Sequence, residues 1–176
     1  MAAVGVLLGH SARTATAETA GARTVAVQTA TAQPSVVTCA ATVYVNDPDP
    51  NGTNVRSAPG AKSKVVATIT DSDSELDITG SSGDWLRVRQ VRSVDGKATF
   101  KGEGWVFASL VAVRARGPAV LRATPDAAGG IVEKLRDDDQ LSLVSCRGDW
   151  LQVKHRTRTG WIGKNARCGN PVTSCV

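Results

Sequence analysis

The most constraining feature of this 176-residue chain is an internal repeat of short blocks. The paired blocks are GDWLRV (83–88) with GDWLQV (148–153), VRSAP (55–59) with LRATP (121–125), LDI (76–78) with LSL (141–143), and GWV (104–106) with GWI (160–162). All four occur in the same order at nearly constant spacing. The chain therefore contains two copies of one structural unit.

The pattern inside each copy is typical of β-structure. From Cys39 onward, short β-branched runs alternate with Gly, Pro, Asp and Ser every 8–12 residues, and no window has a helical period. We expect about five short strands per unit. Twenty residues separate Trp85 from Trp105 but only eleven separate Trp150 from Trp161. The Asp95-Gly96 dipeptide places the extra length of the first copy in a hairpin.

One family shares this order of motifs. The run Asn54-Val55-Arg56-Ser57-Ala58-Pro59-Gly60, followed by G-D-W-L and G-W, resembles the bacterial SH3-like domains, type 3 in particular. The resemblance covers about residues 45–113 and 117–168, and the second copy lacks the Asn and the Gly of the opening motif. It implies an all-β fold with two tandem small SH3-like five-stranded β-barrels after a flexible Ala/Thr-rich N-terminal segment. It also implies cell-wall or protein binding in envelope and secreted proteins, without catalysis.

The N-terminal residues indicate export. A short apolar run in MAAVGVLLG precedes Ala15-Thr16-Ala17, a small-x-small cleavage pattern. No Lys or Arg precedes that run, which implies either a truncated start or no export. We expect a signal peptide at 1–17, a linker at 18–38, one repeat at 39–113 and the other at 114–176. The cleavage pattern predicts a secreted, periplasmic or envelope location. No other segment is apolar enough to be transmembrane.

The even number of cysteines fits an oxidising compartment. We expect all four to form disulfides, and three pairings are possible. The interpretation we favour joins Cys146 to Cys168 within the second repeat and Cys39 to Cys175 across the ends. The alternative is a local bond between Cys168 and Cys175.

The excess of positive charge is confined to the second repeat. Residues 1–113 hold ten basic and ten acidic side chains, whereas residues 114–176 hold eleven and six. Lys154, Arg156 and Arg158 form the densest stretch and are expected at a hairpin tip. We expect Arg147, Lys164 and Arg167 at the same end. This end would bind anionic wall polymer or phosphate; nucleic acid is disfavoured because no nucleic-acid-binding motif accompanies the charge. The alternative is a solvated tip without a ligand.

The tryptophans are the other candidate ligand-binding residues. Strand alternation places Trp85 opposite Leu86, and Trp150 opposite Leu151, so both rings are expected outside the core. Trp105 and Trp161 are expected to pack inside. Each exposed ring would stack on sugar or peptide, although a proline-peptide platform lacks its further aromatic rings.

Nothing in the sequence supports catalysis, a metal or a cofactor. His155 is the one histidine after the predicted cleavage site, and we expect no carboxylate to orient it. Asp137–Asp139 is interpreted as a polar turn. The stretch from Asp47 to Gly52 begins like a calcium loop but has Ala58 where a Glu would complete it. The sequence therefore predicts a non-catalytic protein that engages cell-wall polymer. The alternative is a protein–protein interaction module in the envelope that uses the Trp85 or Trp150 face, and the oligomeric state stays open.

Overall fold

The computed structural model describes residues 35–171, which form thirteen strands and two short 3-10 helices. The first repeat contains β1 (Val37–Val45), β2 (Thr53–Arg56), β3 (Val65–Ile69), β4 (Glu75–Ser82), β5 (Trp85–Arg92), β6 (Ala98–Phe107), η1 (Ala108–Leu110) and β7 (Val111–Ala115). The second contains β8 (Ala119–Arg122), β9 (Ile131–Leu135), β10 (Gln140–Arg147), β11 (Trp150–His155), β12 (Arg158–Gly163), η2 (Lys164–Ala166) and β13 (Arg167–Cys168). Within the described range, no helix has the length and apolarity needed to cross a membrane.

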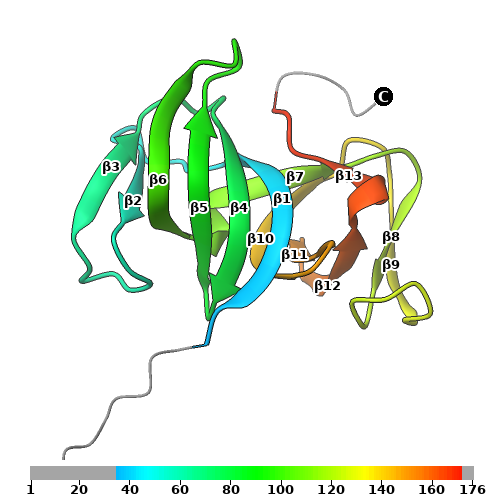
Figure 1. The fold of residues 1–176 in the computed structure, drawn as a ribbon. Helices are drawn as coiled ribbons and strands as arrows, with labels where there is room; N and C mark the ends of the chain where they lie inside the picture. Colours follow the sequence, from blue (N-terminus) through cyan, green and yellow to red (C-terminus); the bar gives the residue numbers. More distant parts are fainter. Residues whose placement is uncertain (1–34, 172–176) are drawn as a thin grey trace, which may run out of the picture. The chain divides into compact units, whose positions relative to one another are not determined.

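The expected all-β fold with two tandem SH3-like units is confirmed (Figure 1). The five strands expected per repeat are β2 to β6 and β8 to β12. The longer β5–β6 hairpin of the first repeat turns at Asp95-Gly96, as expected, and Gly96 has a φ of 81°. β1 begins at Val37, where it pairs with Ser81, so its first two residues lie within the segment expected to be linker. Most of that linker and the expected signal peptide lie outside the described residues.

Strand β7 belongs to both barrels. Its first residues, Val111 and Ala112, pair with β1 of the first repeat. Ala112 to Arg114 pair with β10, and Arg114 and Ala115 pair with β13. Strands β10 and β13 both belong to the second repeat. Figure 1 shows β7 passing from one barrel into the other. The repeats are therefore joined through a shared strand, and one continuous core of buried side chains runs through both.

Alternation along the strands produces that core. In β5, Leu86 and Val88 are fully buried while Trp85 is half-buried on the other face. In β11, Leu151 and Val153 are buried and Trp150 is half-buried. This confirms the expected facing of both strands. Each fully buried Leu or Val contributes about 1.5–3 kcal/mol through the hydrophobic effect.

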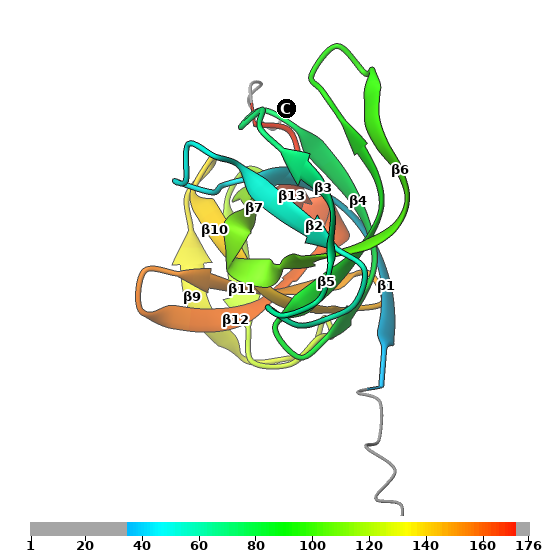
Figure 2. The same ribbon diagram turned by 90° about the vertical axis from the view of Figure 1, so that its left-hand side faces the viewer.

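The glycine of each G-W motif is required by close packing. A Cβ at Gly104 would overlap the Val55 side chain of β2, and one at Gly160 would lie 2.8 Å from Leu121 Cβ in β8. In Figure 2 the β2–β3 hairpin faces the viewer. The glycines thus let the β2–β3 and β8–β9 hairpins lie directly on the following strand.

The arginine of the opening motif ties down the same hairpins. Arg56 Nη1 donates to the Ser63 carbonyl oxygen at 2.8 Å, and Arg122 Nη1 donates to the Gly129 carbonyl oxygen at 2.8 Å. In both repeats the acceptor lies seven residues further along the chain. These two arginines therefore close equivalent loops.

The disulfide pairing that we favoured from the sequence is wrong. Cys39 of β1 is bonded to Cys146 of β10, with 5.8 Å between their Cα atoms and a sequence separation of 107. β1 extends along the β10–β11 turn, where Ala40 N donates to Gly148 O at 3.2 Å and Gly148 N to Thr38 O at 2.9 Å. The sequence did not show this docking of the first strand on the second repeat, which brings the two cysteines together.

The bond between Cys39 and Cys146 leaves Cys168 and Cys175 as the other two cysteines. Cys168 is disulfide-bonded, and Cys175 lies outside the described residues. Of the pairings considered from the sequence, the local Cys168–Cys175 bond is compatible with Cys39–Cys146.

Candidate binding grooves

Groove 1 is a hollow of about 410 Å³ in the first repeat, beside the β2–β3 hairpin. Its lining residues are Asp47, Asp49, Gly52, Asn54, Arg56, Ala61, Trp85, Phe107 and Leu110. The Trp85 and Phe107 rings meet edge to face, with centroids 5.4 Å apart and planes at 68°. Phe107 is 37% exposed. The groove therefore presents two aromatic rings, where the sequence had indicated one.

The acidic rim of groove 1 comes from the loop before β2. Asp47 accepts from Asp49 N at 3.0 Å and from Thr53 Oγ1 at 2.9 Å, and Asp49 accepts from Asn51 N at 2.9 Å. The side chains thus hold the loop in consecutive turns, as the turn chemistry of the sequence indicates. Within residues 35–171 the structure groups no three His, Cys, Asp or Glu side chains in a way that would hold a metal ion.

Groove 2, about 460 Å³, occupies the equivalent position in the second repeat. Its lining residues are Pro118, Ala119, Val120, Arg122, Ala127, Asp149, Trp150, Gly163, Lys164, Asn165 and Ala166. Trp150 replaces Trp85 and Arg122 replaces Arg56, but Gly163 stands where groove 1 has Phe107. A Cβ at Gly163 would lie 3.4 Å from the Trp150 ring, so that ring packs over the glycine.

The charges of the two grooves differ. Groove 1 has two carboxylates and one guanidinium, whereas groove 2 has Arg122 and an ion pair between Lys164 Nζ and Asp149 at 3.2 Å. The members of that pair are 60% and 58% exposed, so solvent screens it and it adds little stability. Groove 2 is therefore the more cationic of the two.

The structure places the tryptophans largely as expected. Trp85 and Trp150 each line a groove. Trp105 is buried at 5% exposure, as expected, and Trp161 is half-buried in β12, opposite Arg122 of β8. Sequence reasoning missed Phe107 and the arginines of the grooves. The match of VRSAP with LRATP already pairs Arg56 with Arg122, but nothing in the sequence places either arginine in a groove.

Lys154, Arg156 and Arg158 are exposed at the β11–β12 turn, as expected, and will be called the basic tip. Among the described residues none of the three forms an ion pair. The expectation that Arg147 lies at the same end is wrong. Arg147 pairs with Trp150 at the start of β11, whereas the basic tip lies at its end.

Lys164 and Arg167 also lie away from the basic tip. Both follow the end of β12, beyond Gly163, which pairs with Trp150. Antiparallel pairing sends β12 back along β11, which separates these residues from the tip by the length of the strands. The basic side chains of the second repeat therefore form two groups.

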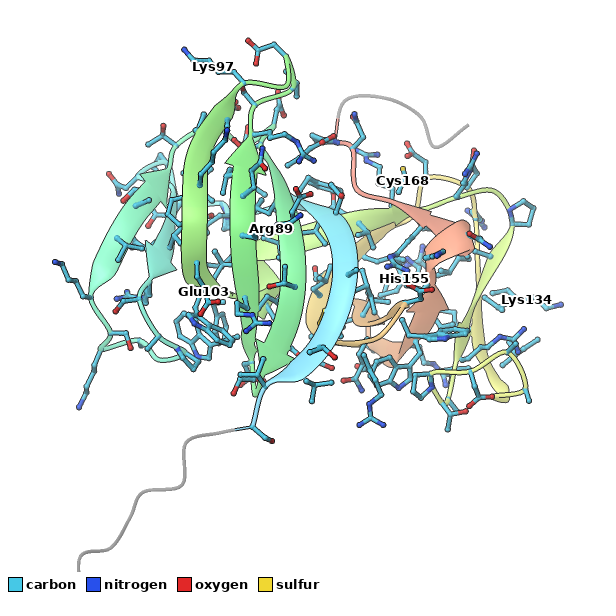
Figure 3. All side chains as sticks on the ribbon, in the orientation of Figure 1. Arg89, Lys97, Glu103, Lys134, His155 and Cys168 are labelled. Carbon is cyan, nitrogen blue, oxygen red and sulfur yellow. A yellow bond between two sulfur atoms is a disulfide. The ribbon has the colours of Figure 1, made fainter. Side chains whose placement is uncertain are left out.

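His155 differs from the sequence expectation. Its side chain is 9% exposed, and Nδ1 lies 3.0 Å from Glu133 Oε1 of β9 while Nε2 lies 3.9 Å from Asp139 Oδ1. The expectation that no carboxylate orients this histidine is wrong, because the closed barrel brings Glu133 of β9 and Asp139 of the β9–β10 turn to it. Figure 3 labels His155 within the second repeat. A buried imidazole held between two carboxylates on neighbouring segments braces the barrel.

The strand order, the shared β7 and the aromatic groove beside each hairpin define a pair of fused small β-barrels of the SH3 class, each with its own groove. Residues 51–112 match a family model described as a bacterial SH3 domain, and residues 115–166 match a second model with the same description. The chain therefore belongs to the bacterial SH3 domain family and carries two copies in tandem.

The solved structures that resemble the chain include two from one organism. NlpC1 from Trichomonas vaginalis is 14% identical with a TM-score of 0.31, over 76% of this chain and 47% of that one. NlpC2 from the same organism is 12% identical with a TM-score of 0.30, over 74% of this chain and 48% of that one. This chain thus spans about half the length of each. No curated protein matches the sequence.

Proposed function

We propose that this protein is a non-catalytic, exported binding protein whose two grooves engage cell-wall polymer. The observation that carries the proposal is the recurrence of a tryptophan-walled groove at the same place in both repeats. Family membership supports it, because bacterial SH3 domains are associated with wall binding. The disulfide between Cys39 and Cys146 supports an oxidising location outside the cytoplasm.

The chemistry of groove 1 suits a glycan or a glycopeptide. Exposed faces of Trp85 and Phe107 offer apolar surface to a sugar ring or an aliphatic side chain. Asp47 and Asp49 retain acceptor capacity for hydroxyl or amide donors. A mixed rim of this kind favours an uncharged or zwitterionic ligand over a polyanion.

The test is co-sedimentation of the full chain with purified peptidoglycan sacculi at low and high salt. Trp85→Ala and Trp150→Ala should each weaken binding, and the double variant should remove it. Ile131→Ala is the matched control, because Ile131 is an exposed apolar side chain (57%) outside both grooves. Full binding by the double tryptophan variant would contradict the groove proposal.

The basic tip is a separate candidate for the same function. Changing Lys154, Arg156 and Arg158 together to Ala should abolish binding only if anionic wall polymer is held there, and that binding should weaken steeply with salt. Groove binding through aromatic rings should depend weakly on salt. The two sites are thus distinguished in one experiment.

A protein partner is the second candidate function. β3 and β9 are the terminal strands of the sheet path, and they expose Val65 at 40%, Val66 at 44% and Ile131 at 57%. Exposed β-branched side chains on an edge strand favour pairing with another strand. Absence of sacculus binding at either salt concentration would favour this alternative.

A further inference from the structure

A cavity of about 600 Å³ lies where strand β1 meets the two repeats. It is lined by residues 40–42 of β1, residues 77–79 of β4, Arg89 of β5, Lys164, and residues 167–169. Figure 3 shows Arg89 and Cys168 on opposite sides of β1. This junction cavity exists because both repeats are fused, and its volume suits a small ligand or one group of a larger one.

Arg167 is the unusual residue of the junction cavity. Its side chain is buried, with the residue 8% exposed, and burial lowers the pKa of its guanidinium to about 10. The equivalent position in the first repeat is Val111, which is fully buried. The second repeat thus has a cationic side chain where the first has a valine of the core. The Asp149 carboxylate attracts this charge and opposes the fall in pKa, but the two side chains form no ion pair. A buried charge that is only weakly paired is costly, which calls for a reason to keep it.

Only one hydrogen bond of the Arg167 guanidinium has an acceptor among the described residues. Arg167 Nη1 donates to the Asp149 carbonyl oxygen at 2.9 Å, and no other acceptor among the described residues receives a hydrogen bond from it. In the first repeat a backbone amide fills that role, because Ala108 N donates to Asp84 O at 2.8 Å. A single N–H of Arg167 is enough to replace that backbone amide as the donor. The guanidinium has five N–H donors, so four remain for another acceptor.

The carboxylate that lines the junction cavity already accepts hydrogen bonds from neighbouring side chains. Asp77 is its one lining carboxylate, and both oxygens accept from Arg92, at 2.6 Å and 3.1 Å. Thr42 Oγ1 also donates to Asp77, at 3.2 Å. Arg89 is exposed and has no ion pair among residues 35–171. Lys164 is already paired with Asp149 at 3.2 Å. The excess of positive charge in the cavity therefore comes from Arg89 and Arg167.

We propose that the junction cavity binds an oxyanion, a carboxylate or phosphate group, with Arg167 as its buried donor and Arg89 and Lys164 at its rim. Guanidinium groups pair with these anions through parallel hydrogen bonds. Lys164 also lines groove 2, so a ligand in that groove can extend an anionic group into the junction cavity. The proposal stands without the groove function, because it rests on this cavity alone.

The test is an NMR titration of the full chain with inorganic phosphate. The arginine Nε–H signals of Arg89 and Arg167 and the amides of residues 40–42 should shift along one saturating curve. Arg167→Val, which installs the residue found at the equivalent position of the first repeat, should weaken phosphate binding by about tenfold or more. Its thermal midpoint should equal or exceed that of the native chain, because a buried charge has been removed.

The control carries Lys62→Ala and Lys134→Ala, which removes two exposed charges outside the junction cavity, both grooves and the basic tip. It should bind phosphate with unchanged affinity. The proposal is overturned if the control loses as much phosphate affinity as Arg167→Val, or if Arg167→Val binds phosphate as tightly as the native chain. In either case the phosphate is held by the general surface charge and not by Arg167. If Arg167→Val fails to fold, Arg89→Met tests the same site at an exposed position and should weaken binding about threefold or more.

Two competitors identify the source of the anion. A glycerol phosphate oligomer that displaces inorganic phosphate at lower concentration than oligoglutamate assigns the site to phosphodiester polymers, and the reverse assigns it to peptide carboxylates. If neither competitor displaces inorganic phosphate, the site holds an adventitious ion only, and the proposal is overturned.

Discussion

Removal of the Cys39–Cys146 disulfide gives the most quantitative prediction. The bond closes a loop across a sequence separation of 107, for which the chain-entropy model gives about 4.7 kcal/mol of stabilisation. We expect the Cys39→Ala, Cys146→Ala double variant to lose about 3–5 kcal/mol in the free energy of unfolding. With a urea dependence of about 2 kcal/mol per M, the midpoint should fall by about 2 M.

Urea unfolding followed by tryptophan fluorescence and by far-ultraviolet circular dichroism measures this loss. Both probes should report one coincident transition, because the repeats share β7 and a continuous core. Ser81→Ala is the control. Ser81 Oγ donates to Cys146 O at 3.1 Å and accepts from Cys146 N at 3.3 Å, so its removal should cost only about 1 kcal/mol.

Two results would refute this reasoning. A loss below about 1 kcal/mol in the double alanine variant would mean that the ladder alone holds β1 on the second repeat. Two separate transitions would mean that the repeats unfold independently, which contradicts the role assigned to the shared strand.

Two further predictions concern the repeated motifs, and a third concerns Asp126 in the loop between β8 and β9. Gly104→Ala and Gly160→Ala should each lower the free energy of unfolding by about 1–3 kcal/mol in urea titrations, since the added methyl meets the hairpin packed on it; a neutral result at either position would contradict the close-packing argument. Arg56→Ala and Arg122→Ala should each cost about 1.5 kcal/mol by thermal unfolding, because each frees a loop carbonyl; similar losses are expected, since the two bonds are equivalent. The pKa of Asp126 is lowered below 3.8 by its hydrogen bonds, first the one from a neighbouring threonine hydroxyl. Its stabilising contribution is therefore present at neutral pH and is lost as the pH falls below 3.8 through the folded-state pKa. Asp126→Asn should accordingly be less stable than the native chain at pH 7 and equal to it near the acid limit, and a difference that persisted in acid would contradict this linkage.

Much of the fold follows from local patterns. Alternation in G-D-W-L-x-V is enough to put Leu86 inside and Trp85 outside, because a strand has a period of two. The two tryptophans named as ligand candidates do line grooves. Phe107 was missed as part of groove 1 because pairing of β5 with β6, at Trp85 and Phe107, is what brings its ring to the tryptophan.

The errors share one cause. The favoured disulfide pairing kept Cys146 within the second repeat, bonded to Cys168, and assigned Cys39 to Cys175, whereas β1 docks on the second repeat and places Cys39 beside Cys146. The carboxylates around His155 come from other segments of the barrel and are twenty-two and sixteen residues away in sequence. Spacing along the chain carries no information on such neighbours.

The repeated blocks, their alternation and their turn residues were sufficient to define strands, inward faces and two equivalent units, because each depends on residues close together in the chain. Sharing of β7, the pairing of Cys39 with Cys146 and the burial of Arg167 in the junction cavity arise when distant strands meet. Such contacts depend on the register and direction of whole strands, and these are established only when the complete sheet closes.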